Sequence, residues 1–146
     1  MFYSFQEFED DIKNIVKELK DKQYTCIACP MRGAMTIAQC LSYALDIPCV
    51  FPIDIKRLQD YNGNYDAYLY TIIPDHLKNE GNKVLVVDDI YDTGVTLDLI
   101  RKYLPNAEYF TLLVRYADRP WEPLYSHCID EDEWVTFWWE DFKECI

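Results

Sequence analysis

The sequence lacks features that would assign it to several classes of protein. It contains no run of about eighteen apolar residues, so we expect no segment that spans or inserts stably into a membrane. Its first residues have neither the basic start nor the small-residue cleavage site of a signal peptide, which predicts a cytoplasmic protein. Basic residues are few, with 14 Lys and Arg against 26 Asp and Glu and a net charge of −12. This balance argues against a nucleic-acid partner, because binding phosphates needs a positive surface.

Cysteine is present without the pattern of a metal site or a disulfide framework. The six cysteines of a cytoplasmic chain are expected to be reduced thiols. Cys26 and Cys29 have the C-x-x-C spacing of redox motifs, but residues three apart on a strand point to opposite faces. No second C-x-x-C and no nearby histidine cluster completes a zinc site. We therefore interpret this pair as structural.

The features that are present indicate one folded domain over residues 1–146. Hydrophobic residues make up 50% of the chain and aromatic residues 16%, which excludes a disordered protein. Ser4 and Glu7 have the spacing of a capping box, and apolar residues then recur with helical period from Phe5. This pattern predicts an amphipathic helix of about four turns.

The rest of the chain is organised around V-L-V-V-D-D-I-Y-D-T-G-V-T, residues 84–96. Residues 84–87 are a continuous apolar run, which predicts a strand buried on both faces of a parallel sheet. Asp88 and Asp89 follow directly, and a small polar turn then leads into a helical pattern. The polar groups therefore lie at the carboxyl end of a sheet, where open α/β folds bind ligands.

The chemistry of this stretch favours a phosphorylated sugar as its ligand. Backbone N–H groups at the start of the helix, over residues 93–96, suit a phosphate. Asp88 and Asp89 suit sugar hydroxyls or a magnesium ion, since the two like charges would otherwise repel each other. A turn in which Asp92 and Thr93 only cap the helix would need one acid rather than three.

The stretch resembles the loop of type I phosphoribosyltransferases that binds 5-phosphoribosyl-1-pyrophosphate. The resemblance implies an α/β fold with a mostly parallel sheet flanked by helices and a small C-terminal hood. It implies that Asp88 and Asp89 hold the ribose hydroxyls, with Asp89 binding Mg²⁺ directly or through water, and that Asp92 assists proton transfer at the base. The residues implied to cradle the 5-phosphate are Thr93, Gly94, Val95 and Thr96.

A second strand, over residues 24–29, ends at P-M-R-G-A and is again followed by a helical pattern. Arg32 beside Gly33 at a helix start suits an anion, although an ordinary turn would have the same sequence. In the resembled family this loop binds pyrophosphate and usually has two glycines after the arginine, where this chain has Ala34. That family often holds the loop with a cis peptide, which we expect between Met31 and Arg32.

A third strand is expected over residues 48–55, with Pro52 indicating an edge position or a bulge. The polar segment that follows has Asn-Gly at its tip and predicts a hairpin or a mobile loop. The resemblance implies a mobile loop over residues 56–67 that closes over the site. Lys56, with Arg57, is expected to reach the pyrophosphate from the base of this loop, and two solvated charges are the alternative.

Further strands are expected at residues 68–73 and 109–114, with a turn at 81–82 between them. The domain then divides into a core of residues 1–114 and a hood of residues 115–146. This division follows the resemblance to the phosphoribosyltransferase layout.

The tail over residues 133–140 is unusually aromatic. Packing, a membrane-surface belt and a platform for a flat ligand are the three interpretations, and the surrounding acids disfavour the membrane. The tail resembles the hood of 6-oxopurine phosphoribosyltransferases, which implies that Trp134 and Val135 bind the base. Arg115 stands where that family has a lysine on the purine oxygen, and the planar guanidinium leaves base specificity open.

By layout, the chain is most similar to the short bacterial xanthine–guanine phosphoribosyltransferases. This implies a magnesium-dependent purine-salvage reaction of 5-phosphoribosyl-1-pyrophosphate with guanine, xanthine or hypoxanthine, in a dimer or tetramer. The spacing of Asp88 and Asp89 does not fit a haloacid-dehalogenase-type phosphatase, and a P-loop motif is absent. The alternatives left open are a regulator of the same fold that senses nucleotides, and an enzyme for adenine, uracil or orotate.

Overall fold

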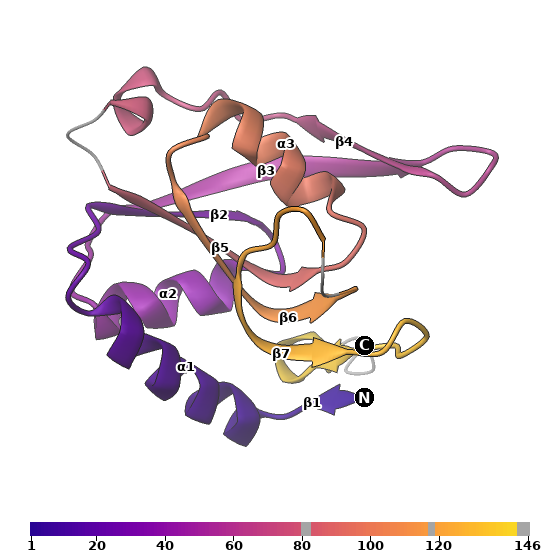
Figure 1. Ribbon diagram of the computed structural model, residues 1–146, viewed down its shortest axis with the longest axis horizontal. Coiled ribbons are helices and arrows are strands. Elements are labelled where there is room, and N and C mark those ends of the chain that lie inside the picture. The colour runs from indigo at the N-terminus through magenta and orange to yellow at the C-terminus, as the bar shows by residue number, and fades with distance from the viewer. Residues whose placement is uncertain (80–82, 117–118, 143–146) are drawn as a thin grey trace.

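The computed structural model describes residues 1–79, 83–116 and 119–142, and its centre is a six-stranded sheet (Figure 1). The strand order is β4-β3-β2-β5-β6-β7, and every neighbouring pair is parallel except β3 and β4. The strands are β2 (Cys26–Met31), β3 (Val50–Gln59), β4 (Tyr65–Leu69), β5 (Val84–Tyr91), β6 (Glu108–Arg115) and β7 (Leu124–Ile129). The mostly parallel α/β sheet is the one that the sequence predicts. The turn expected at 81–82 lies outside the described residues.

Helices cover both faces of this sheet (Figure 1). The helices α1 (Phe5–Leu19) and α2 (Met35–Ala44) pack on one face, and α3 (Val95–Tyr103) packs on the other. The predicted capping box starts α1, because Ser4 and Glu7 each accept the other's backbone N–H. Among the described residues, no helix is long and apolar enough to cross a membrane.

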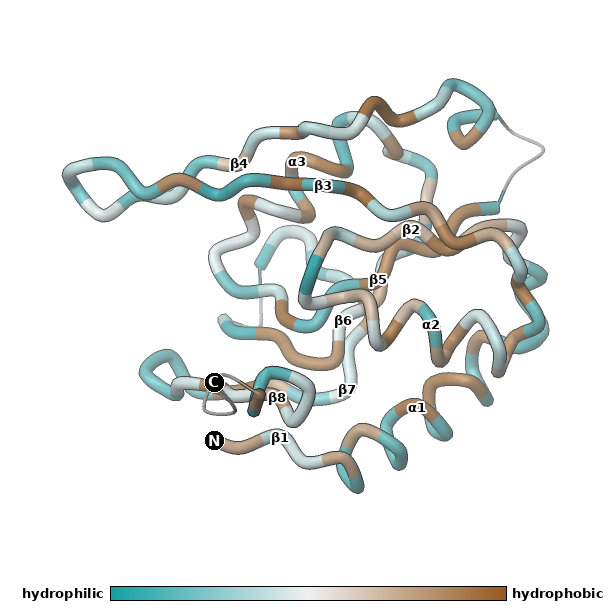
Figure 2. The backbone as a smooth tube through the Cα atoms, turned by 180° about the vertical axis from the view of Figure 1, so that it is seen from behind, coloured by the Kyte–Doolittle hydropathy of each residue, from teal (hydrophilic) through white to brown (hydrophobic). Residues whose placement is uncertain are grey.

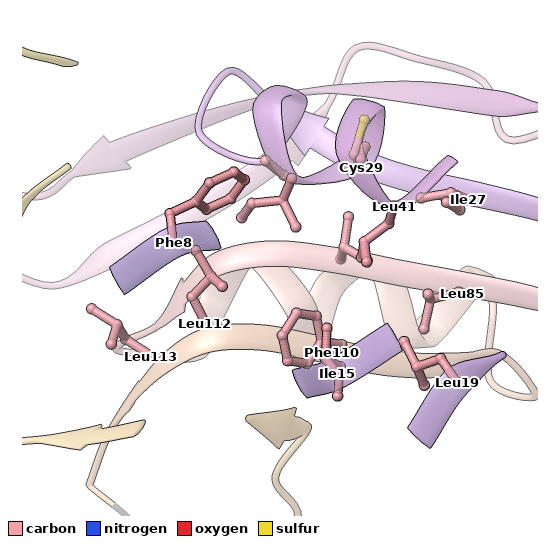
Figure 3. Close-up of a cluster of buried hydrophobic side chains, with 14 of the residues drawn as sticks. Phe8, Ile15, Leu19, Ile27, Cys29, Leu41, Leu85, Phe110, Leu112 and Leu113 are labelled. Carbon is pink, nitrogen blue, oxygen red and sulfur yellow. The ribbon is translucent and has the colours of Figure 1, made fainter. Parts of the chain in front are cut away.

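Alternation along the buried strands gives the sheet two hydrophobic cores. Ile27 and Leu85 contribute to the core under α1 and α2, where they join Leu41 and Phe110 (Figure 3). Their neighbours in sequence point to the opposite face and pack with α3. A strand buried on both faces is rigid, and its carboxyl end therefore offers a firm base for a site.

A hairpin of β3 and β4 extends the sheet beyond the body of the protein, and its tip is hydrophilic (Figures 1 and 2). This confirms the hairpin expected after the third strand. The loop takes up only residues 60–64, so β4 begins at Tyr65, three residues earlier than the predicted strand. Pro52 pairs with Cys29 of β2, and the pairing with β4 starts only at Ile55, so β3 is an edge at the proline, as predicted.

The tail folds back onto the beginning of the chain. A short strand β8 (Thr136–Phe137) pairs in parallel with β1 (Phe2–Tyr3), which the sequence did not predict. Trp138 and Trp139 then pack against Phe8, with ring centroids 5.9 and 5.5 Å apart. The short helices η1 (Asp75–Lys78) and η2 (Trp138–Glu140) complete the fold. Packing is thus the observed role of these two tryptophans.

Candidate active site

A cavity of about 520 Å³ lies at the carboxyl ends of β2 and β5, between the sheet and the tail. Most of the predicted site residues line it: Arg32, Gly33, Asp88, Asp89, Asp92, Thr96, Arg115, Trp134 and Val135. Thr93, Gly94 and Val95 line a smaller hollow that shares Asp92 and Thr96 with the cavity. Residues far apart in the sequence therefore meet at the sheet edge that the motifs indicate.

Lys56 is the predicted site residue that lines neither space. Side chains alternate along β3, so Ile55 and Arg57 face the cavity whereas Lys56 points to the opposite side of the hairpin. Arg57 therefore provides the cation on this wall. The alternation from buried Ile53 was the signal in the sequence that could have distinguished the two residues.

Asp88 and Asp89 form the floor of the cavity. Asp88 is only 7% exposed, and its Oδ1 accepts the backbone N–H of Asp89 at 2.9 Å. Burial raises the pKa of the Asp88 carboxyl well above its usual range, and the Asp89 charge adds to the rise. Burial also raises the pKa of Asp89 to about 6. Two adjacent carboxylates with raised pKa values, one buried and one half-buried, are poised for a cation or for hydroxyl donors.

The turn after β2 packs directly against this acidic floor. A Cβ placed on Gly33 would lie 2.1 Å from Oδ2 of Asp89, so only glycine permits this approach. The peptide bond between Met31 and Arg32 is cis, as the resemblance implies. The Arg32 side chain lies on the cavity wall beside these carboxylates.

The turn before α3 presents the start of that helix to the same space. Gly94 has φ +93°, and a Cβ there would lie 2.9 Å from Oδ2 of Asp98 and 3.0 Å from Nη1 of Arg119. In the part of the chain that the structure describes, no side chain caps α3 at Gly94. Its first backbone N–H groups are therefore available to an anion.

Arg115, at the end of β6, is held by the protein rather than presented to a ligand. Its side chain is 10% exposed, and Nε donates to Oδ1 of Asp92 at 2.9 Å. Its two terminal nitrogens donate to backbone carbonyls of the tail, those of Asp130, Glu131 and Glu133, at 2.6–2.8 Å. The guanidinium of Arg115 therefore has few N–H donors left for the expected contact with a base oxygen.

Arg119 is a site-forming residue to which the sequence analysis gave no role. Its Nη2 donates to the backbone oxygens of Asp92 and Arg115, and its guanidinium lies 4.5 Å from the ring centroid of Tyr91. Arg115 and Arg119 thus hold the side chain and the backbone of Asp92 from two directions. A lone arginine after a strand carries no periodic signal, which explains why it was missed.

The tail wall of the cavity is exposed and partly acidic. Trp134 is 83% exposed, so its indole is free to stack on a flat ligand. Glu140 and Asp141 also line the cavity, opposite the carboxylates of β5. An incoming polyphosphate would therefore meet Arg32 and Arg57 as its cations.

The donor set fits a magnesium ion that arrives with a phosphate ligand. Within residues 1–79, 83–116 and 119–142, no group of three or more metal-binding side chains gathers in one place. Asp88 and Asp89 supply two adjacent carboxylates, and Mg²⁺ typically combines one or two carboxylates with substrate phosphates and water. The site thus suits a shared metal rather than a resident one.

The site and the sheet together place two acids, two arginines and an open helix start at the carboxyl edge of an α/β fold. The family model described as the phosphoribosyl transferase domain matches residues 1–137, and the chain belongs to this family.

Several individual proteins similar to this chain are purine phosphoribosyltransferases. The chain is 29% identical over 109 residues to the xanthine-guanine phosphoribosyltransferase of Cereibacter sphaeroides, and the match covers 75% of this chain but only 65% of that relative. The structure of the Helicobacter pylori xanthine-guanine-hypoxanthine phosphoribosyltransferase superposes with a TM-score of 0.71 at 26% identity, over 99% of this chain and 96% of that one. The Pyrococcus horikoshii purine phosphoribosyltransferase gives 0.77 at 21% identity, over 96% and 93%, and supports the fold.

Proposed function

We propose that this chain is a cytoplasmic, magnesium-dependent purine-salvage enzyme. It would transfer the phosphoribosyl group of 5-phosphoribosyl-1-pyrophosphate to guanine, xanthine or hypoxanthine and release pyrophosphate. The observation that carries the proposal is one cavity lined by Asp88, Asp89 and the exposed Trp134, joined through Asp92 and Thr96 to the hollow at the open start of α3. The relatives named above support the 6-oxopurine class.

The geometry suggests a role for each half of the cavity. The N–H groups of residues 93–96 would bind the 5-phosphate, Arg32 and Arg57 the pyrophosphate, and Asp88 and Asp89 the ribose hydroxyls. Mg²⁺ held by Asp89 would neutralise pyrophosphate charge. A transition state with positive charge on the sugar ring is stabilised by such fixed carboxylates.

Asp92 would receive the proton that the purine ring nitrogen loses as it bonds to C1 of the sugar. Its Oδ1 accepts the Arg115 bond, which leaves Oδ2 to take the proton. The base itself would lie against Trp134 and Val135. Because Arg115 is committed to the tail carbonyls, we propose that it positions Asp92 rather than reading the base.

The test is turnover of 5-phosphoribosyl-1-pyrophosphate and Mg²⁺ with guanine, xanthine, hypoxanthine and adenine offered separately. We expect a nucleotide product with at least one oxopurine, and Asp92→Asn should reduce kcat by about 100-fold. Product with adenine alone would keep the reaction and overturn the base assignment.

The regulator is the second candidate function, and the same experiment separates it. A chain that binds 5-phosphoribosyl-1-pyrophosphate tightly but yields no product with any base would be a sensor. RNA or DNA binding at physiological salt would support that outcome, against the net charge of −12. The oligomeric state, proposed as a dimer or tetramer, is measurable by light scattering on the same sample.

A further inference from the structure

Two cysteines that are distant in sequence meet at the amino ends of β2 and β3. Cys26 is the first residue of β2, and Cys49 directly precedes β3. The backbone N–H of Ile27 donates to the carbonyl of Cys49 at 2.9 Å, and Ile27 pairs with Val50. This register places the two cysteines opposite each other, and their Sγ atoms lie 2.8 Å apart.

The C-x-x-C spacing that marks this region is not the pairing that the fold produces. Cys29 points into the core under α1 and α2, whereas Cys26 points into the core under α3. The thiols of Cys26 and Cys29 are therefore on opposite faces of the sheet, as expected for residues three apart on a strand. Cys49 is the thiol that faces Cys26.

The two thiols differ in access to solvent. Cys26 is 2% exposed, and burial together with the Cys49 contact raises its pKa to about 12. Cys49 is exposed. A reagent in solution therefore reacts with Cys49 first. Cys26 is shielded from solvent, and its thiol contacts that of Cys49. This arrangement of an accessible thiol beside a buried second thiol is typical of pairs that form a disulfide by exchange.

We propose that Cys26 and Cys49 are a modification site that forms a reversible disulfide with a low-molecular-weight disulfide as oxidant. The Cys49 thiolate attacks one sulfur of the oxidant, forms a mixed disulfide and releases one thiolate. Cys26 then loses its proton, attacks Sγ of Cys49 and expels the second thiolate. The oxidant gains two electrons and becomes two thiols, and the cysteine pair loses two electrons.

The bond would stabilise the protein without touching the cavity. It closes a ring over residues 26–49, which contains the Arg32 turn and α2, and such a ring reduces the entropy of the unfolded chain. The bond lies at the amino ends of the strands, whereas the cavity lies at their carboxyl ends. We expect Tm to rise by several degrees on oxidation and to return on reduction, with turnover unchanged.

The experiment treats the full chain with glutathione disulfide, blocks the remaining thiols and maps the tryptic peptides. The disulfide should link peptide 23–32 to peptide 33–56 and remove two reactive thiols. Cys49→Ser should abolish the link. Cys40→Ser is the matched control, because Cys40 lies in the same peptide and on α2, and this variant should still form the link.

Each other result would overturn the proposal. A stable mixed disulfide of glutathione on Cys49 would show that Cys26 does not reach its partner. A link that survives in Cys49→Ser, or disappears in Cys40→Ser, would assign the bond to another pair. An unchanged thiol count after treatment, in protein whose far-ultraviolet circular dichroism shows it to be folded, would show that the pair does not oxidise.

Discussion

The two halves of the cavity are built in different ways. The half proposed for the sugar and phosphates consists of strand ends and turns, with Asp88 buried and Gly33 in contact with Asp89. The half proposed for the base consists of the tail, with Trp134 largely exposed and its loop held by Arg115. The first half is fixed by local backbone geometry, whereas the second depends on long-range contacts. Substitutions in the first half should therefore have the larger effects.

Gly33→Ala should produce the largest loss. The added Cβ would lie 2.1 Å from Oδ2 of Asp89, so the turn or the carboxylate must move. A shift of about 1 Å in a group that binds the substrate lowers kcat/KM by about 100-fold. Steady-state kinetics would measure it, with Gly63→Ala as the control, because Gly63 is a turn glycine that lies at the hairpin tip and does not line the cavity. Turnover of Gly33→Ala within twofold of the unmodified chain would show that this half is adjustable.

Arg115→Lys should have a smaller effect, of about tenfold, and mainly on kcat. A single ammonium cannot hold Asp92 and the tail carbonyls together, so the proton acceptor becomes less well positioned. A residue that contacts the base would instead raise KM for the base. Arg101→Lys is the matched control, since that guanidinium lies over Trp121, outside the cavity. An increase in base KM with unchanged kcat would contradict the positioning role.

The difference between the locally built sugar half and the long-range base half of the cavity also determined what the sequence could predict. Hydrophobic runs and polar turns located β2, β5 and the turns after them, because each signal lies within about a dozen residues. The pairing of β1 with β8 and the bonds from Arg115 to Glu133 join segments that no local pattern connects. Local patterns therefore identified the residues at the sheet edge, but not which groups hold the tail in place.

The sequence did not distinguish Lys56 from Arg57 for a similar reason. Both cations follow the predicted strand, and the facing side depends on how far β3 continues into the hairpin. The sequence analysis ended the strand at residue 55, whereas β3 extends to Gln59 and keeps its alternation. Because β3 continues, every second side chain after Ile53 lies on the same face of the strand, so Arg57 rather than Lys56 faces the cavity with Ile55.

Asp89→Asn should change stability rather than only activity. The pKa of Asp89 is raised to about 6 in the folded chain, above the usual value near 4, so the folded state binds this proton more tightly than the unfolded state does. The contribution of Asp89 to the free energy of unfolding should therefore fall by about 2 kcal/mol as pH rises from about 4 to about 6, less than the full shift implies because the carboxyl is partly exposed.

Urea denaturation of the ligand-free protein across this pH range would measure the fall. Asp89→Asn should make the fall smaller and stabilise the protein above about pH 6, because the amide carries no charge to bury, whereas Asp88, whose pKa is also raised, still titrates. Asp75→Asn is the control, since the Asp75 side chain is 99% exposed. If Asp89→Asn kept the same pH dependence as the unmodified chain, ionisation of Asp89 would not destabilise the folded protein.

His127→Ala should have the smallest effect, and it separates the scaffold from both halves of the cavity. Nε2 of His127 lies 2.8 and 2.9 Å from the two carboxylate oxygens of Asp11, which also accepts the hydroxyl of Tyr3. Asp11 is 6% exposed, so loss of one partner leaves a buried carboxylate less well satisfied. We expect the free energy of unfolding to fall by about 1–2 kcal/mol, with kcat and KM unchanged.

The control for this variant is His127→Gln, whose amide keeps an N–H donor and should recover part of the loss. Urea midpoints measure the stability of each variant, and turnover at saturating substrate measures the site. Because His127 lies on β7, which leads into the loop held by Arg115, a fall in kcat would couple the α1–β7 contact to the base half of the cavity. An unchanged kcat would show that the contact between His127 and Asp11 stabilises the fold without affecting the base half of the cavity.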